Sequence, residues 1–127
     1  LKNKNIKTTV LIGAKTKSLV LCEKDFKKLG FETYIATDDG SRGCEGFVSR
    51  LFKPEAGAMV YACGPNPMLR CIASACKRKR IDCEVSLEEK MACGIGACLG
   101  CSVKVKSGSN KLACKDGPVF KAFDIAW

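Results

Sequence analysis

Four cysteines near the C-terminal end constrain this chain more than any other feature. They follow the spacing C-x4-C-x2-C-x12-C, at Cys93, Cys98, Cys101 and Cys114. Glycines alternate with the first three, at Gly94, Gly96 and Gly100. Glycine permits the positive φ angles and the close backbone approach that a loop wrapped around an inorganic cluster requires. The x4-x2 spacing is typical of plant-type iron–sulfur sites, so these residues predict the metal ligands of a 2Fe-2S cluster.

Zinc is the main alternative, because four cysteines also build tetrahedral zinc sites. Zinc modules usually pair two short C-x2-C knuckles, whereas here three candidate ligands share one loop and the fourth stands alone. A zinc-stabilised interaction module therefore stays open as an alternative, and a brown colour with visible absorption bands would exclude it. Three further cysteines, Cys22, Cys71 and Cys76, lie in helix-like apolar segments, where we expect them to be buried.

Composition excludes several classes of function. The 127 residues contain no histidine, which removes the commonest general base and the serine and cysteine triads, so we do not expect acid–base hydrolysis and predict no catalytic residue. The net charge is +9, but the one dense basic run, 77–80, falls at a predicted helix end, where cations complement exposed carbonyls. We therefore expect no nucleic-acid partner. No apolar run approaches the roughly 20 residues of a membrane span, and no leader is evident, which predicts a cytoplasmic chain.

Strand-like and helix-like segments alternate in the first part of the chain. Predicted strands cover 8–12, 31–36 and 58–62, and predicted helices cover 18–29, 47–52 and 67–79. This order is typical of an α/β fold with a mostly parallel sheet. Beyond residue 83 glycine and cysteine dominate, and a short strand pair, 102–106 and 111–113, is predicted to turn at Gly108. We expect one domain over residues 1–83 and a second, small cysteine-rich domain over 84–127.

Several of these segments resemble a known family, the electron-transfer subunit of the NAD-dependent class 1B dihydroorotate dehydrogenases. The resemblance covers nearly the whole chain and is carried by residues 37–48, 61–68, 86–101 and 114–120. It implies a partial ferredoxin-reductase-like parallel sheet that binds NAD, followed by the 2Fe-2S domain. In that family FAD and NAD(H) bind the reductase-like module, and the cluster passes electrons between FAD and the FMN of a separate catalytic subunit. That subunit oxidises dihydroorotate in de novo pyrimidine biosynthesis, and the resemblance implies a heterotetramer with it.

Residue matching to the family also implies nucleotide contacts at the ends of two predicted strands, where parallel sheets place their ligands. The segment Asp38, Asp39, Gly40 and Ser41 would approach the nucleotide, and the segment Cys63, Gly64 and Pro65 would line the nicotinamide side. For the second segment a plain strand-to-helix turn is an equally good interpretation. Partner contacts are expected on the cluster loop, at Ile95 and Leu99.

The sequence departs from the family at two places. Family members carry a flavin-binding barrel, then a first strand with a glycine-rich turn, before the part that this chain matches, and the chain has no G-x-G-x-x-G motif. We therefore expect a C-terminal portion of a longer subunit, with the FAD domain outside it. Lys90 stands where the family is expected to have histidine. A subunit of a related ferredoxin:NADP or sulfide oxidoreductase is the alternative within the same class.

Overall fold

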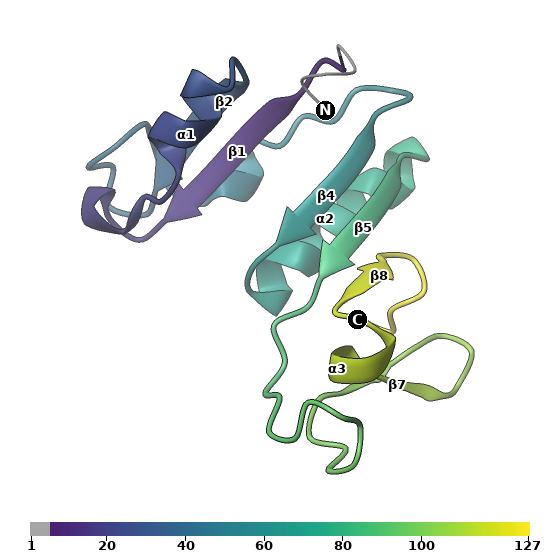
Figure 1. Ribbon diagram of the computed structural model, residues 1–127. Coiled ribbons are helices and arrows are strands. Elements are labelled where there is room, and N and C mark those ends of the chain that lie inside the picture. The colour runs from purple at the N-terminus through teal and green to yellow at the C-terminus, as the bar shows by residue number, and fades with distance from the viewer. Residues whose placement is uncertain (1–5) are drawn as a thin grey trace. The chain divides into compact units, whose positions relative to one another are not determined.

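The computed structural model describes residues 6–127, which form two compact units that divide between Lys53 and Pro54 (Figure 1). Both combine parallel strands with helices, which confirms the α/β class. The predicted domain boundary at residue 84 lies inside the second unit, and the division of the chain into two functional domains stays a prediction.

The first unit is built on a parallel sheet in the order β1-β2-β3. β1 (Thr9–Ala14) pairs with β2 (Glu32–Thr37) over six residues, and β2 pairs with the short β3 (Cys44–Glu45). The end of β2 is buried, whereas β1 is only partly covered. A single 3-10 turn, η3 (Val48–Arg50), packs on β1, and a Cβ added to Gly13 would lie 2.8 Å from the Val48 side chain. Glycine at this point therefore lets η3 approach the strand.

The helix predicted over 18–29 is wrong in extent. A 3-10 turn, η2 (Lys17–Leu19), is followed by extended backbone at Val20, and α1 (Glu23–Lys28) begins only after Cys22, whose φ is 60°. A β-branched residue disfavours helix at position 20, and acidic residues in the first turn with lysines in the last turn favour a helix that starts at residue 23. Cys22 is exposed, so its predicted burial is also wrong.

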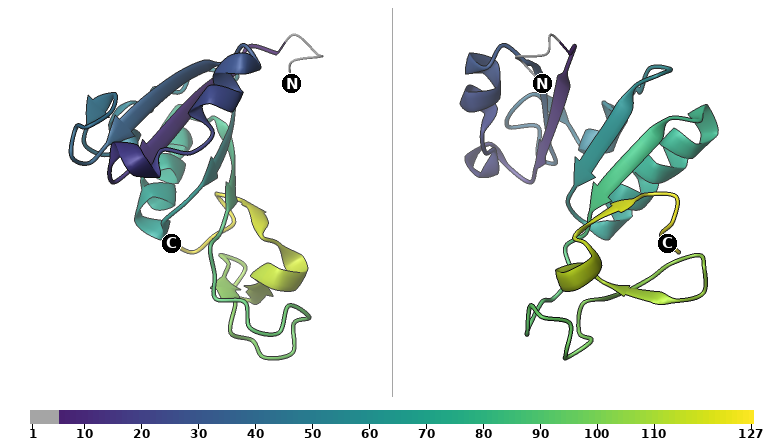
Figure 2. Two further views of the ribbon diagram at one scale, coloured as in Figure 1. Left: turned by 60° about the vertical axis from the view of Figure 1, so that its left-hand side comes forward. Right: turned by 45° about the vertical axis from the view of Figure 1, so that its right-hand side comes forward.

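The second unit is built on a mixed sheet in the order β4-β5-β8. β4 (Met59–Cys63) and β5 (Asp82–Ser86) are parallel, and β8 (Val119–Lys121) is antiparallel to β5. The right-hand view of Figure 2 shows α2 (Asn66–Lys79) along one face of β4 and β5. Proline in the first turn and three basic residues in the last turn match the predicted helix and its basic end.

The core of this unit lies between α2 and the sheet. Leu69 and Cys76 of α2 and Val85 of β5 are each 0% exposed. Cys71 is exposed, so of the three cysteines expected to be buried, Cys76 alone is. Position 71 is five residues from 76, which turns it to the outer face of a 3.6-residue helix.

The remaining elements follow β5 in the chain. β6 (Ser102–Lys104) and β7 (Asn110–Leu112) form the antiparallel pair that the sequence predicts, with Gly108 at φ 85° in the turn. The second strand ends one residue early, because Ala113 begins a four-residue helix, α3 (Ala113–Asp116), that the sequence analysis missed. Among the helices of residues 6–127, none combines the length and the apolar character needed to cross a bilayer.

Candidate metal centre

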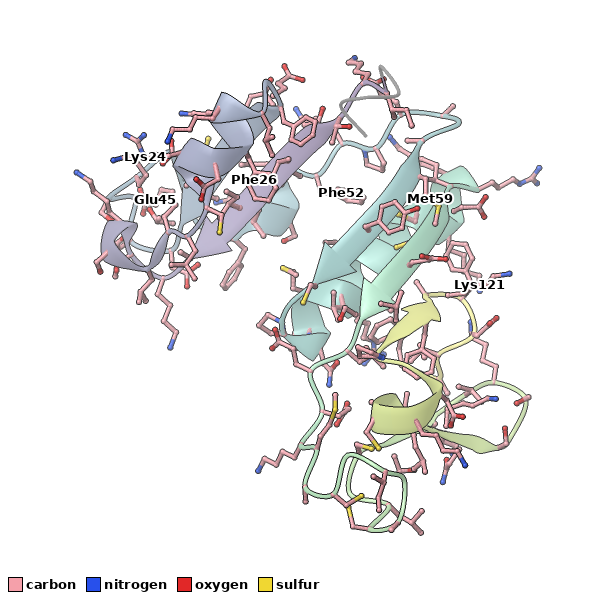
Figure 3. All side chains as sticks on the ribbon, viewed as in Figure 1. Lys24, Phe26, Glu45, Phe52, Met59 and Lys121 are labelled. Carbon is pink, nitrogen blue, oxygen red and sulfur yellow. The ribbon has the colours of Figure 1, made fainter. Side chains whose placement is uncertain are left out.

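The loop between β5 and β6 presents three of the four predicted ligands. It contains no regular secondary structure, and its bends use positive φ angles at Gly94 (69°) and Gly96 (82°). A Cβ at Gly96 would lie 3.2 Å from Cδ of Lys115 and 3.3 Å from Cδ1 of Leu112. Glycine is therefore required there both for the backbone angle and for the close approach of the segment that carries Cys114. Figure 3 shows sulfur atoms, in yellow, on this loop and beside α3.

Cys93 and Cys98 form one pair of thiols. The Cys98 N–H donates to Cys93 Sγ at 3.4 Å. Hydrogen bonds from the amides of Cys98 and Ile95, the Cys98 side chain and the Ala97 amide lower the pKa of Cys93 to about 6. The loop thus curls its backbone donors around one sulfur and stabilises the thiolate, which is the form that ligates metal.

Cys101 and Cys114 form the second pair. The Cys114 N–H donates to Cys101 Sγ at 3.5 Å, and the Ala113 N–H donates to the Cys101 carbonyl at 3.0 Å. Cys101 is only 2% exposed. The hydrogen bond with Cys101, and then desolvation, raise the pKa of Cys114, while the amide of Gly96 opposes that shift. The one-turn helix α3 therefore brings the fourth cysteine from the β7 side of the hairpin to the loop.

The pairing bears on which centre these residues can hold. In a plant-type 2Fe-2S centre two irons share four thiolates, whereas a zinc site gathers all four around a single ion. Two pairs of thiols, with backbone N–H groups directed at the sulfurs, suit a centre that contains more than one metal and carries negative charge. The donor set therefore fits an iron–sulfur cluster better than zinc.

The predicted nicotinamide segment follows β4. Cys63 ends that strand and is exposed, and Pro65 precedes α2. Gly64 has φ 141°, and a Cβ there would lie 2.8 Å from Cε of Met68 in the helix. The segment thus also serves as the strand-to-helix turn that the alternative interpretation predicts. Cys63 Sγ lies 3.9 Å from Oε1 of Glu88, which stands five residues before Cys93.

The other predicted nucleotide segment, Asp38–Ser41, is a tight turn after β2 in the first unit. Asp39 Oδ1 accepts hydrogen bonds from the Ser41 hydroxyl at 2.6 Å and from the Ser41 N–H at 3.0 Å, and these bonds lower the pKa of Asp39. Ser41 Oγ also accepts from the Lys17 N–H at 2.8 Å. A cavity of about 470 Å³ in this unit is lined by Lys17 and Arg42 among others but by none of the four predicted residues.

Two features of the cysteine loop bear on partner contact. The side chains of Ile95 and Leu99 are 77% and 63% exposed, as partner contacts would require. Leu99 has φ 59°, which is costly for a side chain with a γ-branch.

Asp116 was not predicted as a residue of the site. Its Oδ2 accepts a hydrogen bond from the Leu112 N–H at 2.7 Å. An acid two residues after a proposed ligand was the signal that could have pointed to it, because Asp side chains readily accept hydrogen bonds from nearby backbone N–H groups.

Residues 88–126 match the family described as the iron-sulfur cluster binding domain of dihydroorotate dehydrogenase B. The chain is 42% identical over 134 residues to a dihydroorotate dehydrogenase B (NAD(+)) electron transfer subunit from Desulforamulus reducens, covering 100% of this chain and 51% of that protein. The corresponding subunit from Geobacillus sp. (strain WCH70) is 43% identical over 129 residues, covering 98% of this chain and 49% of that protein. The chain therefore spans about half the length of the curated relatives it matches.

A solved structure aligns with the full length of this chain. It is described as the structure of an NADH-dependent reduced ferredoxin-NADP oxidoreductase, studied for flavin-based electron bifurcation. A chain of it aligns with a TM-score of 0.80 at 31% identity, covering 100% of this chain and 47% of that chain. The likeness confirms the expected reductase-like α/β fold with a cysteine-rich C-terminal region.

Proposed function

We propose that this chain, which matches dihydroorotate dehydrogenase B electron transfer subunits along nearly its whole length, is part of such a subunit and relays electrons through a 2Fe-2S cluster. The ligands are Cys93, Cys98, Cys101 and Cys114. The observation that carries the proposal is their arrangement as two hydrogen-bonded pairs, with backbone N–H groups directed at Cys93 Sγ. When bound, such a cluster supplies one-electron chemistry.

The residues of this chain hold and tune the centre rather than transform a substrate. The amides around Cys93 offset the negative charge of a thiolate-bound centre and so raise its reduction potential. Burial of Cys101 keeps water from one sulfur, while the side chains of Ile95 and Leu99 on the same loop are exposed. We assign no catalytic residue to the chain, which acts as a component of an oxidoreductase.

The partner and the other cofactors belong to the same proposal. Electrons would pass between FAD and NAD(H) on one side and the FMN of a dihydroorotate-oxidising catalytic subunit on the other, in a cytoplasmic heterotetramer. Cys63–Pro65 would line the nicotinamide side, and Asp38–Ser41 would approach the nucleotide. Their positions after β4 and β2 support these assignments, because ligands of parallel sheets bind at the carboxyl ends of the strands.

Metal analysis of the purified protein tests the proposal directly. We expect about two irons and two acid-labile sulfides per chain, and an EPR signal after reduction with dithionite. Replacing Cys98 by Ser should remove most of the iron, whereas the same change at the exposed Cys71 should not. Stoichiometric zinc without sulfide would refute the cluster and favour the interaction module.

A subunit of a ferredoxin:NADP oxidoreductase is the second candidate, favoured by the solved structure at 31% identity. The two functions differ in the electron partner. In an assay that contains NAD, the FAD-binding portion of the subunit and the FMN subunit, the first candidate predicts that dihydroorotate reduces the cluster through the FMN subunit. The second predicts reduction by ferredoxin and none by dihydroorotate. Stopped-flow bleaching of the visible cluster bands distinguishes them.

A further inference from the structure

The shortest contact of the Cys114 turn is made by a carboxylate with no role so far. Asp116 Oδ2 accepts the Leu112 N–H at 2.7 Å. The residue is exposed, and among residues 6–127 it takes part in no ion pair. Its one hydrogen bond is therefore directed at the backbone of the segment that carries the fourth cysteine.

That segment needs a clamp because α3 is a single turn. A helix of four residues is not stable by itself, since nucleation costs more than one turn of hydrogen bonds returns. The residue at its N-cap is Leu112, which has no side-chain acceptor for the exposed amides. Cys101 takes two of these amides, through its carbonyl and its sulfur. The Leu112 N–H, at the start of the turn, donates instead to the Asp116 carboxylate at the end of the same turn.

We propose that Asp116 is a positioning residue for Cys114. Its carboxylate closes the turn from Leu112 to Asp116 and so fixes the Cys114 sulfur beside that of Cys101. This inference rests on the proposed function, in which the four cysteines hold a cluster. Asp116 itself touches neither the sulfur atoms nor a substrate.

The test compares two replacements that remove the same negative charge. Asp116→Ala removes the acceptor, whereas Asp116→Asn keeps an oxygen that can accept the Leu112 amide. In the cluster-loaded protein, we expect iron release to a chelator to be about tenfold faster for Ala and within about threefold of the parent for Asn. The EPR spectrum of the dithionite-reduced Ala variant should broaden or shift, because one ligand is less rigidly held, and that of the Asn variant should not.

Asp124→Asn is the matched control, since it removes an exposed carboxylate from the same unit, and it should leave release rate and spectrum unchanged. Parent-like release and spectrum for Asp116→Ala would overturn the proposal, as would an Asn variant damaged as much as Ala. If the Ala variant does not load iron, a loaded Asn variant with the parent spectrum supports the proposal and an unloaded one refutes it. A parent protein without iron and sulfide would instead refute the proposed function.

Discussion

At the scale of single residues, Gly96 shows how the loop and the fourth-ligand turn depend on each other. Its φ of 82° and the contacts that a Cβ would make with Lys115 and Leu112 are two separate reasons for glycine. Gly108 has a similar φ of 85° in open space. The two positions therefore separate the backbone requirement from the packing requirement.

We expect Gly96→Ala to destabilise the cluster-loaded protein more than Gly108→Ala. Each change places a Cβ in the left-handed region, at a cost of about 1 kcal/mol. At position 96 the close approach to Lys115 and Leu112 adds to that cost, and iron release should accelerate. Urea unfolding and chelator kinetics measure the two effects. Equal losses for both variants would contradict the packing argument.

Leu99 presents the reverse case, a bulky residue where glycine would be comfortable. Its side chain is exposed, so no packing in this unit compensates for φ 59°. A strained residue at a functional site is evidence for a use of its side chain. Contact with the redox partner is such a use.

Leu99→Asp should weaken binding of the catalytic subunit at least tenfold and leave iron content unchanged, because a carboxylate would lose solvation in an apolar contact. Leu99→Gly should also weaken binding while it stabilises the loop by about 1 kcal/mol, since the backbone strain is relieved. A binding titration and urea unfolding measure both. Parent-like affinity of the Asp variant would rule out the contact.

At the scale of elements, the sequence predicts the helix α2 well and the structure of residues 18–29 less well. Proline in the first turn, lysines at the end and an apolar face at three- and four-residue steps all indicate the same helix over 67–79. Residues 18–29 carry a similar apolar spacing, but Val20 is extended, and Leu19 and Leu29 at the two ends of that spacing are 55% and 45% exposed, so it does not describe a buried face. Periodicity records which faces could be buried and not whether a neighbour is there to bury them.

The thiols of these elements should differ sharply in reactivity. Cys76 of α2 and Cys83 of β5 are buried, and desolvation, followed by the charge and side-chain hydrogen bond of Cys76, raises the pKa of Cys83 to about 12. Iodoacetamide at pH 8 should modify the exposed Cys22 and Cys71 in the folded protein and spare Cys76 and Cys83. Peptide mass spectrometry reads the result. Early modification of Cys83 would contradict the described packing.

The first residue of α1, Glu23, makes an acid-sensitive contact with Lys27 of the same helix and with Arg42, which follows β2. Hydrogen bonds from Arg42 and Lys27, both at 2.7 Å, lower the pKa of Glu23 from 4.5 to about 2. A carboxyl with a lowered folded-state pKa stabilises the fold above its unfolded value, and the contribution is lost as the pH falls from about 4.5 toward 2.

Glu23→Gln should therefore lower the stability of the apoprotein at pH 6 and leave it close to the parent at pH 2. Urea titrations across this range measure the difference. Glu45→Gln, a change of an exposed carboxylate on β3 in the same unit, is the control and should leave the stability at pH 6 nearly unchanged. A gap between parent and Glu23→Gln that stays constant with pH would contradict the assignment.

At the scale of the whole molecule, the four cysteines proposed as cluster ligands all lie in the second compact unit. Each unit has its own hydrogen-bonded sheet. Loss of the cluster should therefore loosen residues 54–127 more than residues 6–53. Hydrogen exchange before and after chelation measures this, and faster exchange spread evenly over both sheets would contradict it.

The α/β class was predictable because it depends on local patterns of residues, and such a pattern also predicts the four cysteines as ligands, which stays a prediction. The strands β5 and β8 were missed because each is short and depends on distant partners: β5 pairs with β4 and β8, and β8 pairs with β5 across more than thirty residues of intervening chain. Asp116 was missed for the same reason on a smaller scale, since its value depends on a turn that periodicity does not reveal. The nucleotide contacts at Asp38–Ser41 and Cys63–Pro65 stay predictions.

The pairing of β5 with β8 closes the metal-binding segment at its base. The strand before Cys93 and the strand after Cys114 lie side by side, and the Leu87 N–H donates to the Pro118 carbonyl at 3.0 Å just beyond them. The same sheet contains β4, which ends at Cys63. Electron tunnelling slows exponentially with separation. A redox centre fastened at both ends to this sheet would therefore keep a constant distance from it, and from any one-electron donor or acceptor docked there, where a centre held at one end would move.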